Sequence, residues 1–240
     1  MMKTKFLMLA ASLLLTHSSL KAQSLADIGF GYDYSVFDGS PSPYDQVGDV
    51  WGKFKDSSGT LLNATNSVAG IGYFTTTPTS FSADTAIFDD FVFLASAPVN
   101  SIYGGINYPG ELDATETNVD VTAASGKKAY LAVFKGITDV ANYSDAIELG
   151  LVSAMTWDTF SGAAAPGTPV PLEYAVGQTA IDTANGGAGG MHIGSEVNDA
   201  RFGEEEGFNY HTAVVPEPAA AGLLLGVFAL LSSLHRRRRA

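Results

Sequence analysis

Cysteine is absent from all 240 residues of this chain, and its absence excludes several kinds of site. No disulfide, thiolate nucleophile, cysteine-bound zinc, iron–sulfur cluster or lipid-modified N-terminal cysteine can form. Stability must therefore come from a packed core. The composition provides for one, because 46% of the residues are hydrophobic and 14 Phe, 10 Tyr and 2 Trp are present, residues in which disordered chains are poor.

Histidine is also scarce, and the common catalytic signatures are missing. Only His192 and His211 lie outside the terminal segments, and no His-Glu-x-x-His, Gly-x-Ser-x-Gly or phosphate-binding Gly-x-x-x-x-Gly-Lys pattern occurs. We interpret both histidines as solvated or hydrogen-bonded residues. A Ser-His-Asp triad stays open as an alternative, because its members meet in space rather than in sequence.

Basic residues are rare between the two ends of the chain. There are six of them: Lys53, Lys55, Lys127, Lys128, Lys135 and Arg201. The same stretch holds 24 of the 25 acidic residues, so its net charge is −18, six minus 24. Such a surface repels phosphate backbones and attracts cations, and we therefore expect no nucleic-acid partner.

Two acidic clusters are candidates for calcium or for carbohydrate chemistry. Asp89-Asp90 and the glutamates Glu204, Glu205 and Glu206 could supply oxygen ligands, or carboxylates paired by folding could act on a glycosidic bond. Neither cluster has the Asp-x-Asp-x-Asp-Gly loop typical of calcium sites. We interpret them as solvated acids and expect no cofactor.

The N-terminal segment is typical of a secretory signal peptide. Residues 1–5 are basic, an apolar run of about ten residues follows, and Ala22 supplies the small residue that signal peptidase needs beside the cut. We expect a signal peptide at 1–22, with cleavage after Ala22. The alternative is a retained membrane anchor, but a spanning helix needs roughly 17–25 apolar residues.

The C-terminal segment contains three elements in a fixed order. Pro216, Glu217 and Pro218 come first, and the two prolines keep this peptide extended and block helix formation. An uncharged apolar run at 219–234 follows and predicts a short membrane-spanning helix of roughly 24 Å. Four arginines come last: Arg236, Arg237, Arg238 and Arg239. This basic cluster should hold the extreme end in the cytoplasm.

This tail resembles the PEP-CTERM sorting signal, and the resemblance covers residues 215–239 only. It implies that the chain is a substrate of a membrane-embedded exosortase, is cut near the Pro-Glu-Pro and passes to the outer surface or extracellular matrix. Such proteins usually occur in Gram-negative bacteria that make exopolysaccharide. Ala219 stands where many members have Ser. The alternative is an ordinary tail anchor that happens to contain two prolines.

The middle of the chain predicts a mainly β domain. Short apolar or alternating runs recur between turn residues, without sustained helical periodicity, at 28–36, 50–54, 68–75, 86–94, 119–122, 129–134, 147–160 and 170–176. This pattern predicts an antiparallel β-sandwich or jelly roll, with a barrel as the lesser alternative. We expect a domain at 23–202, an acidic and polar tether at 203–214 and the sorting signal at 215–240. As an alternative, Phe208 and Tyr210 could still pack as a last strand of the domain.

Several local features are also expected. The Ser-Gly turn within 123–128 predicts a hairpin between the runs at 119–122 and 129–134, and a short helix is expected at 143–149. The glycine-rich segment at 182–190 predicts a flexible surface loop. Four aromatic residues could stack on sugar rings or pack in the core, with the core as the expected role: Trp51, Tyr103, Tyr108 and Trp157.

Two classes of function fit these features. The chain could be a non-enzymatic surface or matrix protein associated with exopolysaccharide, which we favour. Alternatively, it could be a secreted polysaccharide-acting hydrolase displayed by the same route. The expected partners are signal peptidase, an exosortase and, transiently, the inner membrane.

Overall fold

The structure is a computed structural model, and it describes a mainly β domain. The described residues are 24–31, 53–103, 106–154, 157, 159–161, 169–175, 190–198 and 208–216. The expected signal peptide with Ala22, the helix at 219–234 and the arginine cluster lie outside these ranges. Within them, no helix is both long and apolar enough to cross a membrane.

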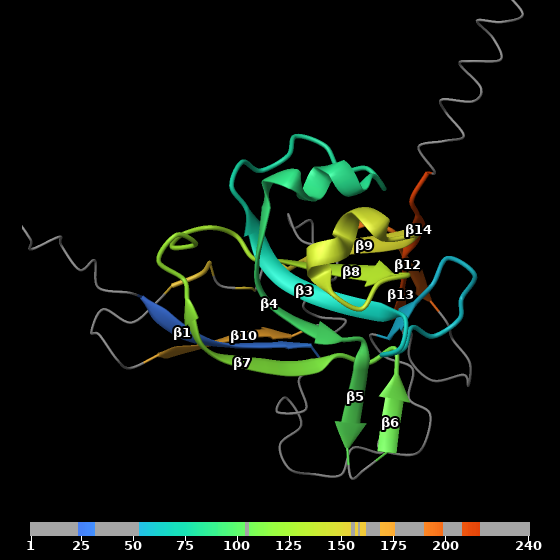
Figure 1. Ribbon diagram of the computed structural model, residues 1–240, viewed down its shortest axis with the longest axis horizontal. Helices are drawn as coiled ribbons and strands as arrows, with labels where there is room; N and C mark the ends of the chain where they lie inside the picture. Colours follow the sequence, from blue (N-terminus) through green and yellow to red (C-terminus); the bar gives the residue numbers. More distant parts are fainter. Residues whose placement is uncertain are drawn as a thin grey trace, which may run out of the picture.

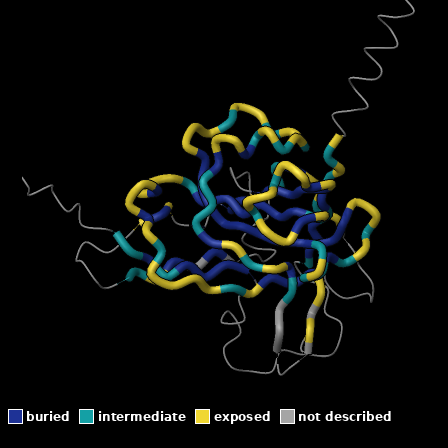
Figure 2. Tube along the Cα trace, viewed as in Figure 1, coloured by how far each residue is buried: buried dark blue, intermediate teal, exposed yellow. Residues whose placement is uncertain are grey.

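The central layer is a sheet with the strand order β11-β9-β8-β3-β4. These strands span Gly190–Ile193 (β11), Glu148–Ser153 (β9), Tyr130–Lys135 (β8), Ser67–Phe74 (β3) and Phe91–Pro98 (β4). All neighbours in this order are antiparallel. Every residue of β3 and β9 is buried, and Figure 2 shows this buried band through the middle of the molecule. Strands buried at every position need cover on both faces of their sheet.

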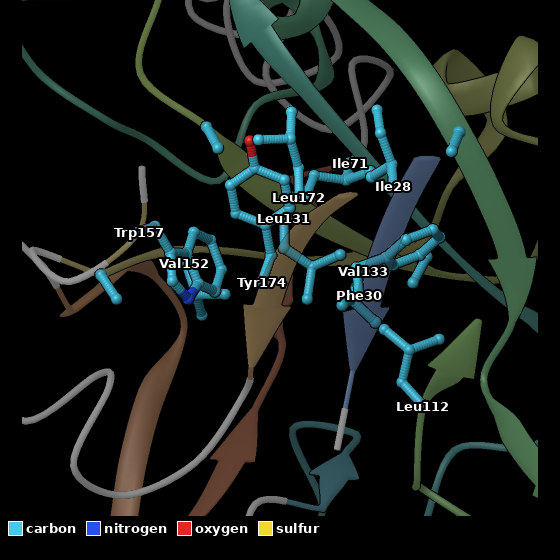
Figure 3. Packing of buried hydrophobic residues seen from close by; sticks show 14 of the residues in the cluster. Ile28, Phe30, Ile71, Leu112, Leu131, Val133, Val152, Trp157, Leu172 and Tyr174 are labelled. Carbon is cyan, nitrogen blue, oxygen red and sulfur yellow. The ribbon is translucent and has the colours of Figure 1, made fainter. Parts of the chain in front are cut away.

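A three-stranded sheet covers the first face. It consists of β10 (Val170–Ala175), β1 (Leu25–Gly31) and β7 (Asp113–Asp120), with β1 in the middle, parallel to β10 and antiparallel to β7. The two sheets bury one shared cluster, which includes Ile28, Phe30, Leu172 and Tyr174 on one side and Ile71, Leu131, Val133 and Val152 on the other (Figure 3). This cluster is larger than the second buried cluster, which lies on the opposite face of the central sheet.

Two short 3-10 helices, η2 (Thr85–Asp90) and η3 (Val140–Asp145), cover the opposite face (Figure 1). An aspartate precedes each helix as its N-cap residue. The Asp84 side chain accepts a hydrogen bond from the Ala86 N–H, and the Asp139 side chain accepts one from the Ala141 N–H. Beneath them lies an aromatic cluster. The Phe88 and Phe134 ring centroids are 4.9 Å apart, and the cluster also contains Phe74, Phe91 and Tyr130. The central sheet is therefore enclosed on both faces.

One glycine of β3 allows this close packing. A Cβ at Gly70 would lie 2.6 Å from the ring of Phe93 and 3.0 Å from Val140. Any side chain at this position would displace the Phe93 ring and Val140 of η3, which lie over it.

The C-terminal strands complete the domain at one end of the central sheet. β13 (Phe208–His211) pairs antiparallel with β12 (Ser195–Asn198) and parallel with β2 (Phe54–Lys55). One residue further on, β14 (Ala213–Val214) pairs antiparallel with β9. A hairpin of β5 (Asn100–Tyr103) and β6 (Ile106–Pro109) extends away from the sheets (Figure 1).

The prediction of a mainly β domain is confirmed, and four local predictions are corrected. The run expected as a strand at 86–94 starts as η2, and only its residues from Phe91 onward belong to β4. Residues 119–122 and 129–134 form no hairpin, because β7 pairs with β1 whereas β8 pairs with β3 and β9. The helix expected at 143–149 is η3, which ends at Asp145, and Glu148 already begins β9.

The tether expected at 203–214 contains β13 and β14, because Tyr210 is fully buried and packs against Phe54. The alternative of a last strand at Phe208 and Tyr210 is thus the one observed. Of the loop expected at 182–190, only Gly190 is described, and it begins β11.

The aromatic cluster on β8 provides a test of this core. Phe134→Ala should lower the free energy of unfolding by about 3–5 kcal/mol in urea denaturation, because it removes a fully buried ring from a strand enclosed on both faces. Phe134→Leu should cost less, since it refills part of the volume. A loss below about 1 kcal/mol for the alanine variant would show that the ring does not lie in a packed core.

Candidate functional site

A buried ionic cluster joins three segments of the chain next to the C-terminal strand. Lys135 ends β8, and it lies opposite Glu148 at the start of β9. The Lys135 Nζ is 2.8 Å from the Glu148 Oε1 and 2.9 Å from the Oδ2 of Asp56, which follows β2. The side chains of Asp56 and Glu148 are only 9% and 8% exposed, so water screens these contacts weakly.

The remaining carboxylate oxygens of this cluster are also bonded. The Asp56 Oδ1 accepts hydrogen bonds from the Ser58 N–H, the Ser58 hydroxyl and the Thr60 N–H. The Glu148 Oε2 accepts from the Ser57 N–H at 2.6 Å and from the Thr212 hydroxyl at 2.7 Å. A buried ion pair is tolerated when its other hydrogen-bonding positions are filled in this way.

The cluster keeps both carboxylates ionised. Burial alone would raise the pKa of Asp56, but hydrogen bonds from Lys135, Ser58 and Thr60 outweigh it and hold that pKa well below its ordinary value. Burial of Glu148 is likewise outweighed by Lys135, Thr212 and Ser57, so its pKa is also lowered. Hydrogen bonds to the two carboxylates raise the pKa of Lys135. A glycosidase pair needs one carboxyl with a raised pKa, and this pair has none.

Thr212 connects this cluster to the end of the described chain. Its N–H donates to the Lys55 carbonyl at 2.9 Å while its hydroxyl bonds Glu148. Beyond it, Ala213 and Val214 lie opposite Leu149 and Glu148.

Among the described residues, the backbone hydrogen bond furthest along the chain lies just before the proline motif. The Val215 N–H donates to the Ile147 carbonyl at 2.9 Å, and Pro216 is exposed. The ionic cluster therefore holds the chain at Thr212, and Pro216 directly follows the hydrogen-bonded Val215. Glu217, Pro218 and the arginines Arg236 to Arg239 lie outside the described residues.

The structure brings one histidine and one serine together. The Ser153 Oγ lies 2.7 Å from the His192 Nε2, at a bulge between β9 and β11. Burial, with a smaller effect from the charge of Lys128, lowers the pKa of His192 to about 4, so its ring is neutral at pH 7. Ser153 is fully buried and offers its hydroxyl to no substrate. The prediction that His192 is a hydrogen-bonded residue is confirmed, and this pair links two strands.

The other candidate residues are placed apart. Asp89 and Asp90 are exposed, and the Asp89 carboxylate accepts a hydrogen bond from the Tyr143 hydroxyl at 2.9 Å. Within the described residues, no three His, Asp or Glu side chains gather as a metal site. Trp157 packs in the core with its ring centroid 5.7 Å from that of Tyr174. Glu204 to Glu206, Trp51 and the side chains of Tyr103 and Tyr108 lie outside what is described.

Sequence reasoning missed the ionic cluster, although one signal for it exists. Lys135 is one of only six basic residues in the acidic middle, and it directly follows the apolar run at 129–134. A lysine at the end of a buried strand needs carboxylates nearby. Its partners, 79 positions before and 13 positions after it in the chain, could not be identified without the pairing of the strands.

Replacing Lys135 tests the role of this cluster. Lys135→Met leaves two buried carboxylates without their cation and should lower the free energy of unfolding by about 3–5 kcal/mol in urea denaturation. Lys127→Met, which removes the same charge from an exposed position, is the control and should change it by about 0.5 kcal/mol at most. Equal effects of the two substitutions would contradict the role assigned to Lys135.

The pH dependence gives a second readout for the same variant. Because the folded-state pKa values of Asp56 and Glu148 are lowered, their stabilisation is present above their unfolded values near pH 4 and is lost as the pH falls further. Wild-type stability should therefore decline from about pH 5 downward. Lys135→Met should lose much less over this range, since its carboxylates gain from protonation.

Comparisons with protein-family models, with curated proteins and with solved structures find no match to this chain. Its function is inferred from its own residues.

Proposed function

We propose that this chain is an exported cell-surface or extracellular-matrix protein, with a sandwich-like β domain delivered through a PEP-CTERM-type tail by an exosortase. The observation that carries the proposal is the order of Pro216-Glu217-Pro218, the uncharged run at 219–234 and Arg236 to Arg239. The chain is the substrate in this scheme, and the membrane enzyme supplies the catalytic groups.

The position of the last strand supports this assignment. Val215 is hydrogen-bonded to the domain, and the apolar run begins at residue 219, so only three residues separate them. At about 3.3 Å per extended residue, those three residues span roughly 10 Å. Before cleavage, the domain would lie directly on the outer face of the inner membrane, with the Pro-Glu-Pro segment at that surface.

The buried chemistry of the domain favours a structural or binding role over hydrolysis. The carboxylates that folding brings together are closed around Lys135, and the hydroxyl beside His192 is fully buried. The contact between the central sheet and the sheet of β10, β1 and β7 supports a sandwich-like arrangement. We expect this domain to associate with exopolysaccharide or with neighbouring surface proteins once the tail has been removed.

A substitution in the motif tests the proposal. Glu217→Ala should leave export and folding unchanged, because the residue follows the last strand, but uncut precursor should accumulate in the inner membrane. Glu206→Ala removes an acid of the same kind outside the motif and should be processed like wild type. Intact-mass measurement of protein from the cell surface and from the inner membrane provides the readout.

Two results would contradict the sorting assignment. Wild-type protein that still ends at Ala240 on the cell surface would refute cleavage of the tail. Equal processing of wild type, Glu206→Ala and Glu217→Ala would show that the motif carboxylate is not recognised.

A further inference from the structure

We propose that β14 and Val215 form a releasable strap, residues 213–215, which must detach from β9 before an exosortase can cut the tail. This inference rests on the proposed function and adds a conformational step to it. The strap is the last paired segment before Pro216, and the ionic cluster lies immediately before it.

The strap is held weakly compared with the strands before it. β14 has two residues and, within the described chain, pairs with β9 alone. Of the strap's side chains, Ala213 and Val215 are partly buried against the aromatic cluster. Val214 is 59% exposed, and Ile147, whose carbonyl accepts the Val215 N–H, is 55% exposed. Short edge segments with exposed hydrogen bonds open at a low free energy, well below that of global unfolding.

Opening is needed because the backbone before the motif is already in use. Enzymes that bind an extended peptide pair with its backbone N–H and C=O groups, as an added strand does. The Val215 N–H is bonded to Ile147, and the proline that follows has no N–H to offer. An enzyme that binds the peptide on the N-terminal side of the Pro-Glu-Pro therefore competes with the Ile147 carbonyl for the Val215 N–H.

The ionic cluster sets the limit of this opening. Thr212 is held by the Lys55 carbonyl through its N–H and by Glu148 through its hydroxyl, and only 3% of it is exposed. Detachment can therefore release residues 213–215 without disturbing β13. Three residues in extended conformation add roughly 10 Å of reach to the motif.

A disulfide across the strap tests this proposal, and the absence of native cysteine ensures that only the introduced pair can form. Ile147→Cys combined with Val215→Cys would join the two residues that share the last backbone hydrogen bond. The control pair is Ser195→Cys with His211→Cys, which are register partners on β12 and β13 and lie before Thr212. Full-length precursor is followed by pulse-chase in spheroplasts that contain the exosortase, with and without dithiothreitol.

The strap predicts a specific pattern of cleavage. The oxidised precursor that carries Ile147→Cys and Val215→Cys should be cut at least about tenfold more slowly than wild type, which corresponds to locking out a minor open state. Dithiothreitol should restore cutting in the same chain, and this recovery excludes misfolding as the cause. The control disulfide should have no effect. Cutting of the oxidised strap variant at the wild-type rate would overturn the proposal.

A loosened strap gives an independent check. Ala213→Gly weakens β14 three residues before the motif and should be cut at least as fast as wild type, with unchanged global stability. Slower cutting of this variant would count against the strap. Failure of wild type to be cut under any condition would instead refute the sorting function on which the strap rests.

Discussion

The C-terminal end of the domain depends on one interaction, the contact of the Lys135 ammonium group with the buried carboxylates of Asp56 and Glu148. It joins the end of β8, the start of β9 and the loop after β2, which are distant in sequence. Each charge is costly to bury, and the cluster is tolerated because Ser57, Ser58, Thr60 and Thr212 bond the remaining carboxylate oxygens. Removing one member would leave the others buried and unpaired.

The cluster also relates the fold to the proposed export route. The apolar layers fix the central sheet, and β9 of that sheet holds both the Ser153–His192 contact and the strap. The hydroxyl of Thr212 links the C-terminal strands to the ionic cluster. Beyond it Val214 is exposed, Ala213 and Val215 are partly buried, and the described β14 pairs with β9 alone. These residues thus mark the boundary between the folded domain and the tail whose removal we propose.

Much of the β structure could be predicted from local pattern. The runs at 68–75 and 129–134 closely match β3 and β8, because buried strands appear as continuous apolar segments bounded by turn residues. The run at 170–176 matches β10, where buried Leu172 and Tyr174 alternate along the strand. Predictions failed where pairing is non-local. The hairpin expected at 123–128 looked favourable by its turn chemistry, but β1 from the start of the chain takes β7 as its partner.

The C-terminal boundary shows why composition can mislead. The acidic run Glu204 to Glu206 suggested a solvated tether, yet β13 follows it and pairs in parallel with β2, more than 150 residues earlier. The sorting motif that we propose could be inferred from sequence alone because its three elements are contiguous in the chain. The ionic cluster could not, because its members become neighbours only through the sheet.

Native-state hydrogen exchange of the purified protein can show whether the domain up to Thr212 is fixed while the strap at 213–215 opens separately. The amides to compare are those of Thr212, bonded to the Lys55 carbonyl, and Val215, bonded to the Ile147 carbonyl. Thr212 should exchange only through global unfolding, and Val215 should exchange at a much lower free energy by local opening. Equal protection of the two amides would contradict the account.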